Sequence, residues 1–382
     1  MYSIEERKKP KLAVNFGPLK KGGGHNVALN FVFELKRREE TGFDLFFIVC
    51  ESSALKRELE DSKWKDKLCI VSKNPVKRIF QELTVVTKFL KKNGISWVYS
   101  YFGFAFLPAR VKQIIGSADS NLYFPEIDFW REESQIEKVR RYFVDQYRIF
   151  GLKTAFGVIY ENDAMYHRAE ALFGITSKSL IRPSITTPDK NDCCALTERG
   201  EGVRVLLLCG WQRNKNILLV PRLAHELKKL KLNVEFVITA SADGSSCAEE
   251  FFSEVSQWEV ADKINCIGQV DKNELSDLYD KIDFVLLLSL LESFSNNIIE
   301  AWHFGKPLII SDEMWARSIC GNAALYVDRD NAICIAREIV KLYKKEARRK
   351  ELISSGKMEL SKFPTVGQRL EQEFQFIESL VK

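Results

Sequence analysis

The sequence predicts an α/β protein with two Rossmann-like, doubly wound domains in tandem. Short apolar runs alternate with segments of helical periodicity along the whole chain, which is typical of parallel βαβ architecture. At 382 residues, the chain is also longer than one ordinary hydrophobic core supports. A polar stretch with Pro and Gly and no hydrophobic period separates the two halves at 186–202. We therefore expect an N-terminal domain over 1–186, a C-terminal domain over 203–363 and a final segment over 364–382.

Six apolar runs in the first half are the expected strands of its parallel sheet. They are KLAVNF (11–16), DLFFIVC (44–50), KLCIV (67–71), ISWVYS (95–100), NLYF (121–124) and AFGVIY (155–160). Segments with helical periodicity, such as 26–40 and 75–92, fall between most of them.

The second half repeats this alternation more regularly. Its expected strands are RVLLLC, VEFVITA, KINCIG, DFVLLLS, PLIIS and AALYV. After Pro364, the amphipathic segment 366–382 is expected to form one helix, which could cross back to the N-terminal domain. Ligands of such sheets bind at the carboxyl ends of the strands, so the cleft between the two domains is the expected active site.

Composition narrows the class of protein. A chain with 46% hydrophobic and 29% charged residues is expected to be soluble and globular. The longest apolar run, FVLLLSLL, is too short to span a bilayer, and the N-terminus has no apolar stretch of signal-peptide length. Nine scattered cysteines without CxxC spacing, and four histidines, predict a reducing cytoplasm and no metal site.

The charge is unevenly distributed. Residues 1–200 carry 33 Lys and Arg against 25 Asp and Glu, whereas the remainder carries 24 against 27. The basic half is expected to face an anionic membrane surface or a phosphorylated acceptor. Nucleic acid is disfavoured because no aromatic-basic motif or zinc-finger spacing is present. The lysine-rich segment 63–92 fits peripheral contact with anionic lipid, or simply a Rossmann helix with a solvated basic face.

The stretch LESFSNNIIEAWHFGKPLIISD, residues 291–312, combines a strand end, a helix and a helix stop. A helix is expected over 296–304, with Ser295 at its N-cap and a stop at Gly-Lys-Pro. The first amides of this helix, at Asn296 and Asn297, would lie at the positive end of the helix dipole, which favours a phosphate.

Two carboxylates flank this expected anion site, Glu292 on the turn and Glu300 on the helix. A carboxylate beside a phosphate is repelled unless it binds something else, and sugar hydroxyls are suitable partners. A nucleotide-sugar carries hydroxyls at both ends, on its ribose and on the transferred sugar. The alternative is that both glutamates are ordinary solvated charges at helix ends.

The motif resembles a known family. The Glu-(seven residues)-Glu spacing around Ser-Phe, followed by FGKPLIISD and by GNAALYVD (321–328), looks like the C-terminal half of family 4 (group 1) retaining glycosyltransferases of the GT-B fold. The resemblance covers about 203–345. It implies a nucleotide-diphosphate sugar donor as co-substrate, no cofactor, no metal and retention of configuration. It also implies that Glu292 holds the transferred sugar, that the amides after Phe294 meet the sugar or diphosphate, and that Glu300 holds the ribose.

The stretch CGWQRNKNILL (209–219) follows the first strand of the second domain and opens a helix. After Gly210, Arg213 and Lys215 bring positive charge to where a diphosphate would leave. The family resemblance implies an Arg and a Lys here, and Lys215 matches its position, whereas Arg213 departs from the commonest spacing. No nucleophile with an adjacent base is evident, so we expect front-face substitution, in which the departing diphosphate helps to deprotonate the acceptor hydroxyl.

Two further candidate binding segments lie in the first half of the chain. Gly22, Gly23 and Gly24 permit close backbone approach by a ligand, and His25 could contact donor phosphates, contact the acceptor or cap the helix. Relatives often carry a His after the strand assigned to NLYF, where this chain has Phe-Pro-Glu, so Glu126 is the titratable candidate there.

These observations predict a retaining glycosyltransferase that adds a sugar to a glycan or lipid-linked glycan in cell-surface polysaccharide synthesis. The expected location is the cytoplasm, with possible association with its membrane. One alternative is a GT-B nucleotide-sugar epimerase, for which no acid–base pair is evident; another is a non-catalytic subunit of a glycosyltransferase complex. An NAD-dependent oxidoreductase is disfavoured because the G-x-G-x-x-G motif is absent.

Overall fold

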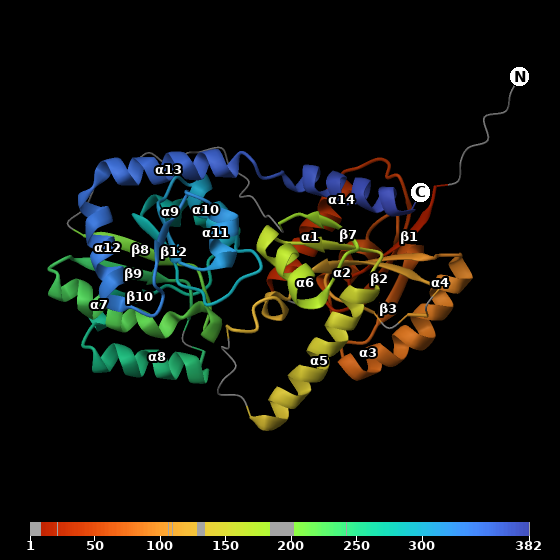
Figure 1. Cartoon of the computed structure of the whole chain (residues 1–382), viewed down its shortest axis with the longest axis horizontal. Helices are drawn as coiled ribbons and strands as arrows, with labels where there is room; N and C mark the ends of the chain where they lie inside the picture. The colour runs from red at the N-terminus through yellow and green to blue at the C-terminus, as the bar shows by residue number, and fades with distance from the viewer. Residues whose placement is uncertain are drawn as a thin grey trace, which may run out of the picture. The chain divides into compact units, whose positions relative to one another are not determined.

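The computed structural model describes residues 9–20, 22–105, 107–108, 110–127, 134–183, 202–241 and 243–381. The chain forms two compact units, each built on its own parallel sheet (Figure 1). The first comprises Met1–Pro125, Glu133–Thr186 and Pro364–Lys382, and the second comprises Glu126–Glu132 and Thr187–Phe363. The segment predicted as the linker, 186–202, lies outside the described residues except for Gly202.

The first unit contains a seven-stranded sheet in the order β3-β2-β1-β4-β5-β6-β7, in which every pairing is parallel. The strands are β1 (Lys11–Asn15), β2 (Asp44–Cys50), β3 (Leu68–Val71), β4 (Trp97–Ser100), β5 (Lys112–Ser117), β6 (Gly157–Tyr160) and β7 (Lys178–Ile181). The helices are α1 (Gly23–Lys36), α2 (Ala54–Glu60), α3 (Pro75–Gln81), a π-helical turn (Glu82–Val86), α4 (Thr87–Asn93), α5 (Gln135–Thr154), α6 (Asp163–Phe173) and α14 (Val366–Val381).

The strand predicted at NLYF was wrong. Residues 120–122 form a 3₁₀ turn, and the ring of Tyr123 is buried with its hydroxyl 2.5 Å from Ser117 Oγ. The strand in this place is β5, KQIIGS, which carries just two strongly apolar residues and so escapes a search for apolar runs. Gly116 within β5 is required by packing, because a Cβ there would lie 1.9 Å from the carbonyl oxygen of Tyr101. The half-exposed edge strand β7 was also missed.

The second unit contains a six-stranded parallel sheet in the order β10-β9-β8-β11-β12-β13. Its strands are β8 (Val203–Leu207), β9 (Val234–Ile238), β10 (Ile264–Cys266), β11 (Phe284–Leu287), β12 (Leu308–Ser311) and β13 (Leu325–Val327). Its helices are α7 (Val220–Lys229), α8 (Ser246–Gln257), α9 (Leu275–Asp280), α10 (Asn296–His303), α11 (Met314–Cys320), α12 (Ala332–Lys344) and α13 (Glu346–Leu360). Helix α12 packs on α7, and α13 packs on α10.

The last helix, α14, packs on α1 within the first unit. Leu370, Phe374 and Ile377 enter the same apolar core as Phe31 and Phe43, and the Phe374 ring lies 6.0 Å and 5.8 Å from theirs. The end of the chain therefore completes the core of the unit that its beginning builds.

Candidate active site

The predicted site residues of the second unit lie at the carboxyl ends of two neighbouring strands. Strands β8 and β11 pair directly, so the loop after β8 and the turn after β11 start at the same edge of the sheet. The two segments are joined by the backbone amide of Leu290, which donates to the carbonyl of Asn214 at 2.7 Å. This places Lys215, from the first segment, beside Glu292, from the second.

Lys215 and Glu292 form an ion pair. The ammonium Nζ contacts carboxylate oxygen Oε1, and the hydroxyl of Ser289 donates to the same oxygen at 2.7 Å. The two side chains are 17% and 12% exposed, so the pair is largely shielded while one side stays open to solvent. Two of the three residues predicted to carry the chemistry are thus in direct contact, and the third, Arg213, is not part of this pair.

A second set of contacts fixes the turn that carries Glu292. The guanidinium Nη1 of Arg329 donates to the carbonyl of Leu290 at 2.5 Å and lies 2.8 Å from Glu313 Oε1. The side-chain amide of Asn216 in turn donates to the carbonyl of Arg329 at 2.9 Å. Burial raises the pKa of Glu313, while Arg329 opposes that rise. Sequence reasoning missed Arg329 and Glu313, because they meet the turn through space rather than through a motif.

Helix α10 begins where it was expected, with Ser295 at its N-cap as predicted. Ser295 occupies the cap position with an extended backbone, and its side chain makes no capping hydrogen bond. The side-chain amide of Asn297 donates to the carbonyl of Leu208 at 2.8 Å, which ties the start of the helix to the end of β8. Phe294 turns towards Phe363, with ring centroids 6.0 Å apart. The first turn of α10 therefore lies at the same sheet edge as Lys215.

Glu300 lies on α10 against a buried tyrosine. The hydroxyl of Tyr279 donates to Glu300 Oε2 at 3.3 Å, and the Tyr279 ring stacks on Phe304 with centroids 4.4 Å apart. Burial raises the pKa of the Tyr279 phenol well above its ordinary value, and the charge of Glu300 adds to that rise. Tyr279 therefore stays protonated and acts as a fixed donor that orients the carboxylate.

Arg213 is directed elsewhere. It forms an ion pair with Glu250 of α8 at 2.9 Å, and both side chains are exposed. Gly210 begins the same loop and has open space where a Cβ would stand, apart from the side chain of Gln212 at 3.8 Å. The loop is also held by Trp211, whose Nε1 donates to Ser241 O at 2.6 Å.

The glycine segment of the first unit opens α1 earlier than predicted. Gly22 occupies the N-cap with φ of +88°, and Gly23 and Gly24 are already helical. His25 is buried, and its Nε2 lies 3.0 Å from Ser53 Oγ, an oxygen that also accepts from the amide of Leu55 at the start of α2. The side chain of His25 therefore joins α1 to α2 and does not cap its own helix.

The structural reason for proposing Glu126 does not hold. No strand precedes it at NLYF, and it lies in a turn that groups with the second unit. Its charge contributes to the raised pKa of Glu313. Within the described part of the chain, no group of three or more His, Cys, Asp or Glu side chains could hold a metal ion. In the same residues, no helix is long and apolar enough to span a membrane.

Comparison with known proteins identifies the domain that carries these contacts. Residues 200–359 match the family model described as "Glycosyl transferases group 1". This part of the chain is a group 1 glycosyl transferase domain. No curated protein sequence gives a significant match to the chain.

The whole chain has the GT-B fold. It is similar to sucrose-phosphate synthase from Thermosynechococcus elongatus, with 13% identity, a TM-score of 0.70, and coverage of 97% of this chain and 99% of that one. It is also similar to Anabaena HepE solved with UDP and glucose, with 14% identity, a TM-score of 0.66, and coverage of 97% and 100%. WaaG, a glycosyltransferase of lipopolysaccharide biosynthesis, aligns with 12% identity, a TM-score of 0.68, and coverage of 96% and 99%. Because these sequence identities are low, the similarity to the solved structures shows only that the fold is the same. The match to the family model applies to residues 200–359.

Proposed function

We propose that the chain is a retaining, metal-independent glycosyltransferase that moves a sugar from a nucleotide-diphosphate sugar to a glycan or lipid-linked glycan. The observation that carries this proposal is the contact between Lys215 and Glu292 at the start of α10, within a group 1 glycosyl transferase domain. There, the Lys215 ammonium, which suits a diphosphate, contacts the Glu292 carboxylate, which suits sugar hydroxyls.

Each residue then has a distinct task. Lys215, with the first amides of α10, stabilises the negative charge that develops on the departing diphosphate. Glu292 accepts hydrogen bonds from hydroxyls of the transferred sugar, and Glu300, oriented by Tyr279, accepts from the ribose hydroxyls. Arg213 contributes charge from the rim of the loop, where it now pairs with Glu250.

In the reaction, the bond between the anomeric carbon and the diphosphate oxygen breaks as the acceptor oxygen bonds to that carbon on the same face. The acceptor proton passes to the departing diphosphate, so no protein base is required. Preorganised charges of this kind commonly supply a large part of an enzyme's rate gain.

The nucleotide-sugar donor is also supported by the HepE structure, which contains UDP and glucose on a similar fold. For this chain we propose uridine or guanosine diphosphate sugars as candidates. Cell-surface polysaccharide synthesis at the cytoplasmic face of a membrane is the proposed setting, in which a lipid-linked acceptor would be found.

Binding of nucleotides tests the proposal. Thermal unfolding of wild type is measured with UDP, GDP, ADP and NAD, and repeated with Glu300→Ala. A ligand at 100 times its dissociation constant stabilises a protein by about 2.7 kcal/mol, which raises the unfolding temperature measurably. Stabilisation by one nucleoside diphosphate, reduced in the variant, is expected.

The matched control is Glu338→Ala, which removes a partly exposed carboxylate of α12 that pairs with Lys341 in the same domain. It should leave nucleotide binding unchanged. Stabilisation by NAD alone would contradict the proposal, and no stabilisation by any nucleotide would favour a non-catalytic subunit.

A further inference from the structure

Helix α5 exposes its apolar side chains instead of burying them. Ile136, Val139, Phe143 and Phe150 recur at the spacing of one helical face and are 82%, 56%, 66% and 55% exposed. We call these four residues the α5 stripe. In a helix that merely covers a sheet, residues at this spacing would face the core. Buried residues of α5 are confined to Gly151 and Leu152, near its end.

The opposite face of α5 is polar and faces the domain. Arg148 pairs with Asp119 at 3.1 Å, and the side-chain amide of Asn121 donates to Asp145 at 3.5 Å. On the side of the stripe itself, between Phe143 and Phe150, Tyr147 donates to the carbonyl of Phe104 at 2.9 Å. The second half of α5 is thus held to the first unit, where the Phe150 ring also lies 6.0 Å from that of Phe104. The first half keeps Ile136, Val139 and Phe143 exposed.

The start of α5 is stabilised locally. Ser134 and Glu137 form a capping box, in which each side chain receives a hydrogen bond from the backbone amide of the other. The capping box therefore stabilises the first turns, which belong to the yellow helix labelled α5 in Figure 1. A rigid helix that presents four large apolar side chains to solvent requires a partner to cover them.

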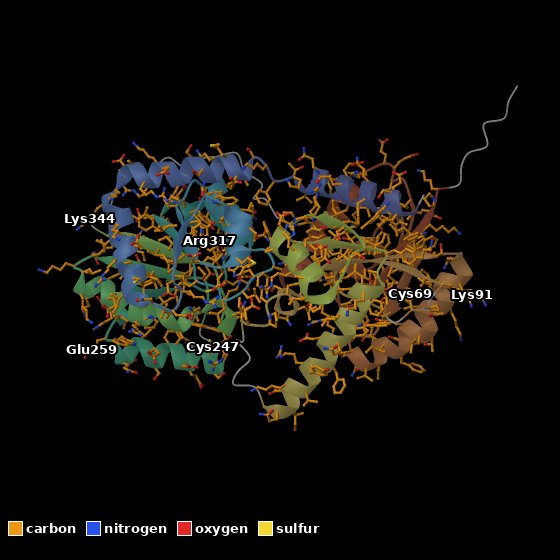
Figure 2. The ribbon with its side chains drawn as sticks, in the orientation of Figure 1. Cys69, Lys91, Cys247, Glu259, Arg317 and Lys344 are labelled. Atoms are coloured by element: carbon orange, nitrogen blue, oxygen red, sulfur yellow. The ribbon has the colours of Figure 1, made fainter. Side chains whose placement is uncertain are left out.

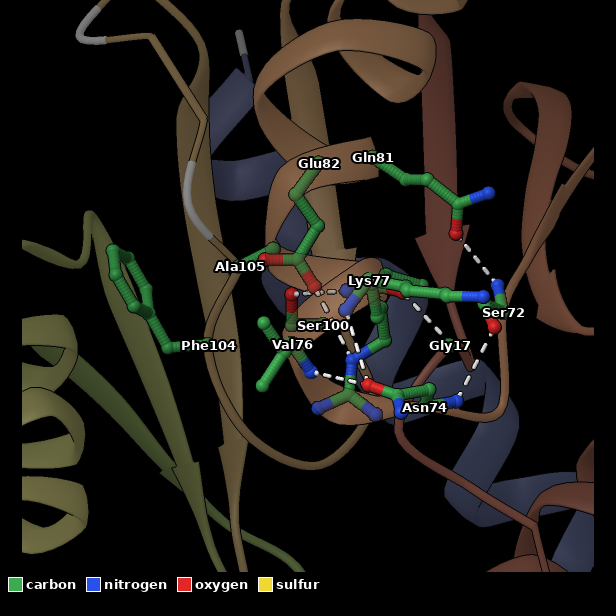
Figure 3. Close-up of polar contacts among 12 residues, drawn as sticks. Gly17, Ser72, Asn74, Val76, Lys77, Gln81, Glu82, Ser100, Phe104 and Ala105 are labelled. Carbon is green, nitrogen blue, oxygen red and sulfur yellow. Dashed lines mark hydrogen bonds and ion pairs between the residues drawn. The ribbon is translucent and has the colours of Figure 1, made fainter.

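A second exposed apolar group lies near α5. Val76, Phe80 and Leu83, on α3 and the π-helical turn, are exposed at helical spacing. The pKa of Tyr147 on α5 is raised by burial and then by the charge of Glu82, which lies on the same π-helical turn. Figure 3 shows Val76 and Lys77 at the start of α3, where the side chain of Asn74 accepts hydrogen bonds from their backbone amides.

Positive charge accompanies both apolar groups. Helix α5 carries five Lys and Arg against two acidic residues, and the segment from α3 to α4 (75–93) carries five against one. Exposed Arg140 lies one turn from Ile136 and from Phe143, so charge and apolar surface alternate along α5. Lys91 of α4 extends outward from the domain (Figure 2).

We propose that the α5 stripe, together with the exposed face of α3, docks on an anionic lipid bilayer. An apolar stripe flanked by Lys and Arg inserts between lipid headgroups while its cations meet lipid phosphates, and two such signals together give stable attachment. A second copy of the chain fits less well, because a symmetric dimer would bring the same positive patch against itself. The inference concerns the first unit and does not depend on the proposed transferase activity.

Vesicle flotation tests this inference with the full chain. Wild type should float with vesicles of phosphatidylcholine and phosphatidylglycerol, and weakly with phosphatidylcholine alone. Phe143→Ser removes a large buried contact in the bound state and should lower the bound fraction by about tenfold or more. Arg140→Gln should weaken binding to anionic vesicles less strongly and reduce its sensitivity to salt.

The matched control is Met358→Ser on α13 of the second unit, which removes a side chain that is 64% exposed there. It should bind vesicles like wild type, and thermal unfolding should show that all three variants are folded. The inference is overturned if wild type does not float with anionic vesicles, or if Met358→Ser and Phe143→Ser weaken flotation equally. It is also overturned if light scattering shows a wild-type dimer that Phe143→Ser converts to a monomer without any change in vesicle binding.

Discussion

The ammonium of Lys215 and the hydroxyl of Ser289 both contact Oε1 of Glu292. Because the second carboxylate oxygen, Oε2, takes no part in these two contacts, Glu292 can hold Lys215 in place and still accept from a sugar hydroxyl. The pair also neutralises itself while the site holds no donor. An arriving diphosphate then meets a cation that is already positioned, so little reorganisation is needed at the moment of reaction.

Replacing Lys215 by Met is expected to lower kcat by about 10²–10³-fold, as loss of a charge-stabilising donor does in other enzymes. It also leaves Glu292 without its ammonium partner and should cost about 1–3 kcal/mol of unfolding free energy. The measurement is steady-state release of nucleoside diphosphate, with urea unfolding in parallel. Arg213→Ala is the informative comparison, since its exposed pair with Glu250 contributes at most about 1 kcal/mol to stability. We expect its loss in kcat to be smaller than that of Lys215→Met, and an equal or larger loss would reverse the roles assigned to the two cations.

Glu300 is expected to recognise the ribose hydroxyls. Hydrogen bonds to a charged group contribute about 1.5–3 kcal/mol each, so Glu300→Ala should weaken nucleoside diphosphate binding by about 10–100-fold. Titration calorimetry with the 2′-deoxy analogue separates this role from a general loss of fold. Wild type should bind the deoxy analogue less tightly than the ribonucleotide, and the variant should bind both alike. Equal discrimination by both proteins would place the ribose elsewhere.

Arg329 is expected to position the turn that carries Glu292. Arg329→Met leaves the Leu290 carbonyl with the longer hydrogen bond from Trp315 Nε1, at 3.4 Å, and Glu313 without its guanidinium partner. This should cost about 1–3 kcal/mol of unfolding free energy and lower kcat. Adding Glu313→Gln to this variant should restore part of the stability but not kcat. If the double variant recovers full activity, Arg329 serves stability alone.

The regular second sheet was predictable because its buried parallel strands are continuous apolar runs, and β8, β9 and β11 appear where those runs lie. β5 was not predictable in this way, since its Gln113 and Gly116 are buried by neighbours that are distant in sequence. The site divides similarly. Lys215 and Glu292 come directly after strands, so their place at the sheet edge could be predicted from the order of elements in the sequence. Tyr279 and Arg329 reach the site from other elements, and no sequence motif marks them.

A buried ion pair is expected to fasten α14 to the first unit. Arg369 Nη2 lies 2.8 Å from Glu373 Oε1, and Tyr99 donates to Glu373 Oε2 at 3.2 Å. Removing one member of such a pair costs about 3–5 kcal/mol, because it leaves a buried charge uncompensated. Arg369→Met and Glu373→Gln should each destabilise the protein, while the double variant should lose less than the sum. Additive losses in urea unfolding would show that the two residues do not act together.

The ion pair between Arg369 and Glu373 also predicts that the stability lost in Arg369→Met depends on pH. Burial raises the pKa of Glu373 above its ordinary value of 4.5, although Arg369 opposes the rise. In Arg369→Met the opposing charge is gone, so the pKa should rise further. A raised pKa in the folded state contributes stability that is full below the ordinary value and is lost as pH rises through the folded value. The variant should therefore recover part of its stability relative to wild type as pH is lowered from neutral towards 4.5. A constant difference across this range would contradict the pairing.

The most direct test of the donor site is turnover of a panel of nucleotide-sugars by wild type and by Glu292→Gln, measured as nucleoside diphosphate released. Wild type should release the diphosphate from one donor, and the variant, which keeps the size of the side chain but loses its charge, should release it at least about tenfold more slowly. Equal release by both proteins, or none by wild type from any donor, would contradict the catalytic roles of Lys215 and Glu292.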